Sequence, residues 1–156
     1  MSEIRFYHLT QTPLEGALPT MLERTLDRGQ RAIVRGGHAD RLRFFDGLLW
    51  TANDASFLPH GIDGDPHPDR HPVWLTTGSD NPNGANVLFL IDGALAATDE
   101  MAGLETTAIL FDGHDEAAVE GARDQWRTVT SAKLAAVYWA QEGGRWVKKH
   151  EAKADG

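Results

Sequence analysis

Short apolar runs alternate along the chain with longer segments in which apolar and polar residues recur at helical spacing. The runs are rich in β-branched and aromatic residues, and several are apolar at almost every position, as strands buried on both faces of a sheet are. They lie at residues 4–9, 31–35, 72–77, 86–92 and 106–112. The pattern predicts strands that alternate with helices, and therefore a largely parallel sheet.

Three segments have the periodicity of helices. Leucines recur every four residues from Leu14 to Leu26, which predicts an amphipathic helix between the first two strands. A second helix is expected over 38–50 and a third over about 115–131. The helices would cover both faces of the sheet, so the predicted fold class is α/β, with three layers.

The last part of the chain predicts a β-hairpin, with a continuation of the preceding helix as the alternative. Residues 133–150 contain strand-favouring valine, tyrosine and tryptophan on either side of Gly143-Gly144, which suits a tight turn. We expect one domain over residues 1–150, followed by a frayed tail at 151–156.

Composition and charge exclude several classes of function. The chain has 156 residues and no cysteine, so thiol nucleophiles, disulfides and iron-sulfur clusters are excluded. No apolar run is long enough to span a bilayer and no export signal is visible, so we expect a cytoplasmic protein. The net charge is −8, which argues against sequence-blind binding of nucleic acid. Residues 121–149 differ from this acidic composition, because they contain six Lys or Arg against two Asp or Glu.

The stretch "SFLPHGIDGDPHPDRHPV" contains three histidines that suggest a metal site. His67 and His71 are separated by a proline and flanked by others, so they cannot share one face of a helix. We therefore expect an exposed, proline-stiffened loop, with a metal-dependent hydrolase using His60, His67 and His71 as the alternative. Phosphate-binding and nucleophile-elbow motifs are absent, so no catalytic residue, metal or cofactor is predicted.

The third predicted helix carries the basic residues Arg123 and Arg127 at four-residue spacing, with Trp126 on the adjoining ridge. Two guanidinium groups beside an aromatic ring suit a peptide that has both acidic and apolar residues, especially one with a terminal carboxylate. The alternative is that Trp126 packs in the core while both arginines are solvated.

Several short motifs resemble the chi subunit family of bacterial DNA polymerase III, a component of the clamp-loader complex. They are "FYHL" near the start, "LLW" and "SFLPHG" at 48–61, "PVWLTTGSDNPNGANVLFLIDGA" at 72–94 and "YWAQEGGRWVKK" at 138–149. The resemblance implies a non-catalytic accessory subunit whose α/β fold is related to nucleotide-binding domains but lacks their motifs.

The resemblance also implies two partners on separate surfaces. Trp50 and Phe57 match the positions that contact the psi subunit. Arg123, Trp126 and Arg127 match those that bind the acidic, phenylalanine-ending C-terminal tail of single-stranded DNA-binding protein, so that DNA is reached indirectly. Val119 stands where the family has a lysine, which removes one charge contact. The remaining alternative is an adaptor that holds only a helicase-like or clamp-loader partner through Trp50 and Phe57.

Overall fold

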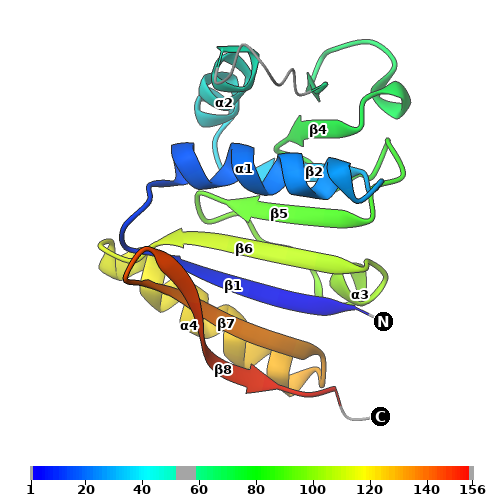
Figure 1. Ribbon diagram of the computed structural model, residues 1–156. Helices are drawn as coiled ribbons and strands as arrows, with labels where there is room; N and C mark the ends of the chain where they lie inside the picture. Colours follow the sequence, from blue (N-terminus) through cyan, green and yellow to red (C-terminus); the bar gives the residue numbers. More distant parts are fainter. Residues whose placement is uncertain (1, 52–58, 155–156) are drawn as a thin grey trace.

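Eight strands form one sheet in the computed structural model, which describes residues 2–51 and 59–154 (Figure 1). The spatial order is β3-β4-β2-β5-β6-β1-β7-β8; the pairs from β3 to β7 are parallel, and β8 runs antiparallel to β7. The strands are β1 (Glu3–Leu9), β2 (Ala32–Gly36), β3 (Gly61–Ile62), β4 (Val73–Thr76), β5 (Val87–Ile91), β6 (Thr106–Asp112), β7 (Ala135–Glu142) and β8 (Arg145–Ala152).

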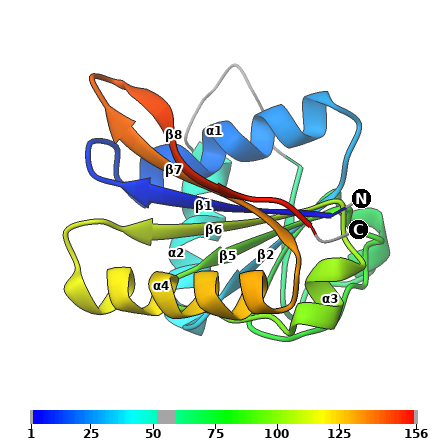
Figure 2. The ribbon, with the colours of Figure 1, turned by 90° about the horizontal axis from the view of Figure 1, so that it is seen from below.

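Helices cover both faces of this sheet. They are α1 (Leu14–Asp27), α2 (Ala39–Thr51), α3 (Thr98–Ala102) and α4 (Glu116–Ser131). Apolar residues of α1 and α2 pack with one face, and those of α3 and α4 pack with the other. Figure 2 shows α1 on one side of the sheet and α3 and α4 on the opposite side. The predicted three-layer α/β class with a mostly parallel sheet is confirmed.

The interior strands are apolar because both of their faces are covered. Every residue of β2, β4 and β5 is buried. The side chains of β1 alternate between the two faces of the sheet: Ile4 and Phe6 pack toward α4, whereas Tyr7 and Leu9 pack toward α1. This strand lies between β6 and β7 and therefore connects the central sheet to the terminal hairpin.

The predicted hairpin is present, with one irregularity that affects which side chains reach each face. Gly143 and Gly144 have φ angles of 59° and 79°, as a tight two-residue turn requires. Tyr138 of β7 pairs with His150, but the next residue, Trp139, pairs with Lys148. One additional residue of β8 is therefore accommodated as a β-bulge.

Two expectations need correction. Strand β8 continues to Ala152, so the first two residues of the segment 151–156 are paired rather than frayed. The histidine-containing stretch is not wholly an exposed loop: β3 pairs with β4, and His60 is only 5% exposed. Its proline-rich part forms a short 3₁₀ helix, η1 (Pro68–Arg70).

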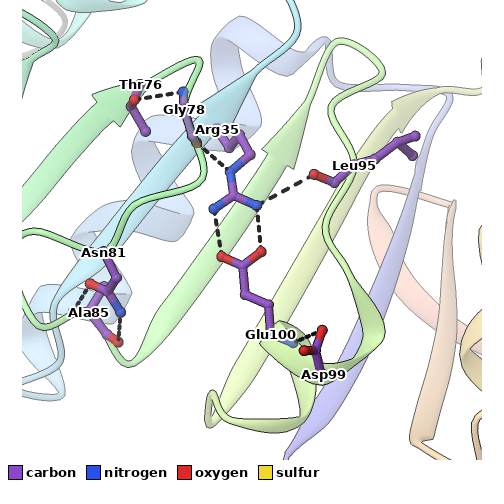
Figure 3. Close-up of polar contacts among 8 residues, drawn as sticks. All are labelled: Arg35, Thr76, Gly78, Asn81, Ala85, Leu95, Asp99 and Glu100. Carbon is purple, nitrogen blue, oxygen red and sulfur yellow. Dashed lines mark hydrogen bonds and ion pairs between the residues drawn. The ribbon is translucent and has the colours of Figure 1, made fainter.

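A buried ion pair connects β2 to α3. The guanidinium group of Arg35 donates two hydrogen bonds to the carboxylate of Glu100, at 2.9 and 2.6 Å, and further ones to the carbonyl oxygens of Gly78 and Leu95 (Figure 3). The side chain of Arg35 is 5% exposed and that of Glu100 is 27% exposed. A single buried cation therefore holds together a strand, a helix and two loops.

We expect Arg35→Ala to lower the free energy of unfolding by about 3 kcal/mol, because it leaves Glu100 without its partner in a poorly solvated position. Urea unfolding of the variant and the unaltered protein measures the difference. The matched control is Arg43→Ala, which removes an ion pair with Asp40 whose side chains are 69% and 90% exposed. It should cost less than about 0.5 kcal/mol, and equal losses in both variants would contradict the role assigned to Arg35.

Candidate functional site

A hollow of about 620 Å³ lies between α4 and β8, on the face of the sheet opposite α1. It brings together all three residues that the sequence predicted for a tail-binding surface. It also includes side chains of the hairpin that the sequence did not single out. The lining residues are Arg123, Trp126, Arg127, Thr130, Tyr138, His150, Glu151 and Ala152.

Trp126 belongs both to the core and to this hollow. Its ring meets that of Phe6 edge to face, with the centroids 5.4 Å apart, and it is also close to Tyr138 and His150 at 6.1 and 6.3 Å. The side chain is half-buried and packs against the cluster under α4. The two alternatives for Trp126 are therefore not exclusive, because core packing fixes the ring while part of it faces the hollow.

The two arginines stand at the exposed rim of the hollow. Arg123 and Arg127 have side chains that are 61% and 68% exposed, and each is within ion-pair distance of the acidic residue three positions earlier on α4, Glu120 and Asp124 respectively. Exposed pairs of this kind contribute less than about 1 kcal/mol. An incoming carboxylate can therefore replace Glu120 or Asp124 at little cost.

Val119 lies one turn before Arg123 on α4. It is half-buried and packs against the apolar cluster, outside the residues that line the hollow. The rim therefore carries its positive charge on Arg123 and Arg127, with Val119 in the position where the family resemblance implies a lysine.

Below the rim, His8 and Tyr138 form a polar pair. The Tyr138 hydroxyl lies 2.8 Å from Nδ1 of His8. Burial raises the pKa of Tyr138, although the charge of Arg123 acts in the opposite direction. Burial also lowers the pKa of His8 below the ordinary 6.5, assisted by the charges of His114 and Arg123 and opposed by a backbone hydrogen bond with Gly113. Both groups are therefore neutral near pH 7.

Gly113 is required for this arrangement. A Cβ atom at this position would lie 2.2 Å from Cδ2 of His8 and 2.8 Å from the backbone oxygen of Leu9. The loop after β6 can therefore approach β1 closely only because residue 113 has no side chain.

The lowered pKa of His8 predicts a specific loss of stability in acid. The unfolded chain takes up a proton on His8 near pH 6.5, whereas the folded chain does so only at lower pH. The free energy of unfolding should therefore fall between about pH 7 and 5 more steeply in the unaltered protein than in His8→Gln. Urea unfolding across this range, with an NMR titration of the His8 imidazole, measures both quantities. Parallel curves, or a His8 pKa of 6.5 or higher, would disprove the assignment.

The predicted psi-binding residues lie elsewhere. Trp50 is at the end of α2, 54% exposed, with its ring 4.9 Å from that of His60. Phe57 lies outside the described residues. Because α2 and α4 cover opposite faces of the sheet, Trp50 and the hollow beside α4 belong to separate surfaces.

The structure does not bring the three histidines of the metal-site alternative into one cluster. His60 Nε2 is 2.9 Å from the carboxylate of Asp46, and the ring of His71 packs near Trp74 at 5.7 Å. His67 occupies the N-cap position of η1, where its backbone has the left-handed conformation. Over residues 2–51 and 59–154, no group of three or more His, Asp or Glu is arranged to hold a metal ion. In the same residues, no helix is long and apolar enough to cross a membrane.

Comparisons with known proteins agree with the resemblance in the sequence. A family model described as DNA polymerase III chi subunit, HolC, matches residues 1–136. A protein named probable DNA polymerase III subunit chi, from Rickettsia prowazekii (strain Madrid E), is 26% identical over 91 residues, or 58% of this chain and 55% of that relative. The match thus spans about half the length of the curated relative. Because the family model covers most of the sequence, including all of α4, this chain belongs to the DNA polymerase III chi subunit family.

Proposed function

We propose that this protein is a non-catalytic accessory subunit of the bacterial replicative DNA polymerase III holoenzyme, acting in the cytoplasm. It would link the clamp-loader complex to single-stranded DNA-binding protein by holding the acidic C-terminal tail of that protein. The observation that carries this proposal is the hollow between α4 and β8, where two exposed arginines stand beside a fixed tryptophan.

Binding of the tail would begin with its charges. The guanidinium groups of Arg123 and Arg127 would exchange Glu120 and Asp124 for the tail's terminal carboxylate and neighbouring aspartates, and each can donate two parallel hydrogen bonds to a carboxylate. The surrounding chain is acidic, with a net charge of −8, so these rim arginines provide local attraction on a surface that otherwise repels acidic peptides.

The terminal phenylalanine would then occupy the hollow. Its ring meets Trp126 and Tyr138, which already contact each other and Phe6 with centroids 5.4 to 6.3 Å apart. Aromatic pairs at such distances contribute about 0.5–1.5 kcal/mol beyond burial of area. Because core packing holds both rings in place, little conformational entropy is lost when the tail binds.

We assign the second contact, with the psi subunit or an equivalent clamp-loader protein, to the exposed ring of Trp50 and to Phe57 in the undescribed segment. The separation of Trp50 from the hollow supports simultaneous binding of both partners. No direct, sequence-specific contact with DNA is proposed.

The tail proposal predicts that a labelled acidic peptide ending in Asp-Ile-Pro-Phe binds with micromolar affinity at low salt. Arg123→Ala should weaken binding at least tenfold, about 1.4 kcal/mol, because a charge-assisted contact is lost. Fluorescence anisotropy measures this. The matched control is Arg145→Ala, which removes an exposed arginine of the same basic segment that does not line the hollow. Affinity should also fall as salt rises.

Failure of the peptide to bind at low salt, or equal affinities for Arg123→Ala and Arg145→Ala, would reject the tail proposal. The chain would then be an adaptor for a helicase-like or clamp-loader partner alone.

A second prediction separates the two surfaces. Trp50→Ala should leave the affinity for the tail peptide unchanged, because the ring lies on the α2 side of the sheet. It should reduce binding of purified psi subunit at least tenfold, whereas Arg123→Ala should not. Surface plasmon resonance with immobilised chain measures both ligands. Loss of peptide binding in a folded Trp50→Ala protein would contradict the assignment of two surfaces.

A further inference from the structure

A second hollow, of about 340 Å³, lies on the other face of the sheet and does not belong to either surface proposed above. Figure 1 shows α1 crossing in front of β2, on the side of the sheet opposite α4, which lies behind β1 and β7. The hollow lies between the carboxyl-terminal half of α1 and the strands β1, β5, β6, β7 and β8. The residues that matter chemically are Arg5, Tyr7, Arg24, Arg28, Trp139 and Trp146.

Three arginines line this hollow, and none of its described lining residues is acidic. Arg24 and Arg28 are exposed and four residues apart at the end of α1, and neither guanidinium group has a hydrogen bond or ion pair within the described part of the chain. Arg5 is partly neutralised by Glu3, at 2.7 Å. Two uncompensated positive charges therefore face this hollow in a chain whose net charge is −8.

The opposite wall is aromatic. Tyr7 and Trp146 meet edge to face with the centroids 5.1 Å apart, and Trp139 is the residue of β7 that pairs with Tyr7. The indole Nε1 of Trp139 is buried and has no hydrogen-bond partner among the described residues. An unsatisfied buried donor is uncommon in folded proteins, and it costs free energy as long as no partner accepts its hydrogen.

We infer that this hollow binds a nucleoside 5′-phosphate. The base would stack against the rings of Trp139 and Trp146, since every base has a face that stacks on aromatic side chains. The phosphate would be held by the planar guanidinium groups of Arg24 and Arg28, which match its oxygens bidentately. The volume suits one small ligand within the usual range for such sites.

Other anionic ligands fit the same residues less well. Inorganic phosphate makes no use of the aromatic wall. A peptide that binds by adding a strand would need a free sheet edge, whereas this hollow lies on the face of the sheet. A long nucleic acid strand would meet the acidic remainder of the surface.

The position differs from that of ordinary nucleotide sites in α/β proteins, which lie at the carboxyl ends of the strands. Here Val87 and Thr106, the first residues of β5 and β6, line the hollow, and the nearby end of α1 is its carboxyl terminus, which carries partial negative charge. The phosphate therefore depends on Arg24 and Arg28, and loss of both should weaken binding at least tenfold.

Two-dimensional NMR of ¹⁵N-labelled full-length protein tests this inference. The chain has five tryptophans, and Trp139→Phe and Trp146→Phe assign two of the indole signals. Adenosine 5′-monophosphate should shift the signals of Trp139 and Trp146 with a Kd of about 0.1–1 mM. Trp126, on the other face, and Trp74, which is buried, serve as internal controls.

Arg24→Ala/Arg28→Ala should weaken binding at least tenfold. Arg43→Ala, at an exposed position on α2, should leave it unchanged. Adenosine and inorganic phosphate should not reproduce the shifts, and an oligothymidine should bind no more tightly than the mononucleotide. The inference is wrong if Trp139 and Trp146 do not respond, if the double arginine variant binds normally, or if only the oligonucleotide binds. These outcomes are independent of the tail proposal, which concerns the opposite face.

Discussion

The β-bulge in β8 determines which aromatic side chains of the terminal hairpin reach each face of the sheet. Regular alternation would place Trp146, Lys148 and His150 on one face. The register shift after Lys148 instead leaves Trp146 beside Tyr7 on the α1 face and turns His150 toward Trp126 on the α4 face. Both hollows therefore obtain part of their aromatic wall from the same strand, and the position of His150 in the hollow beside α4 depends on one extra residue.

The contact of Trp126 with Phe6 has a similar consequence for α4. It fixes the rotation of the helix against β1, so that Arg123 and Arg127 emerge at the rim while Ala122 and Val129 are buried. Asp115 caps the helix by accepting hydrogen bonds from two backbone amides of the first turn, which fixes where α4 begins. The apolar walls are thus rigid, whereas the charged rim can exchange partners, a combination suited to reversible capture of a mobile acidic segment.

Much of this arrangement could be predicted from local patterns. Runs that are apolar at almost every position predicted the parallel strands, and Gly143-Gly144 predicted the hairpin turn. The three-residue spacing of Arg123 and Trp126 predicted that they lie close together on α4. The remainder depends on pairing between distant residues. A regular hairpin around that turn would place Lys149, and not His150, opposite Tyr138, so the residues that β8 contributes to each hollow could not be read from the sequence. The burial of His60 likewise depends on β3 and on Asp46, 14 residues away.

The edge position of β8 explains why both proposed ligands meet faces of the hairpin and not its edge. An unpaired edge strand is a template for adding another strand, and exposed lysines prevent this. Lys148 and Lys149 are exposed in β8, and their ammonium groups pair with Glu151 and Glu142.

Strand β7 is held on both sides, by β1 and β8, so its two faces are fixed relative to each other. A ligand shifts an equilibrium only through different affinities for two conformations. Both β7 and β8 supply residues to each hollow, but β8 is paired on one side only, so we expect any coupling between the hollows to act through a movement of β8.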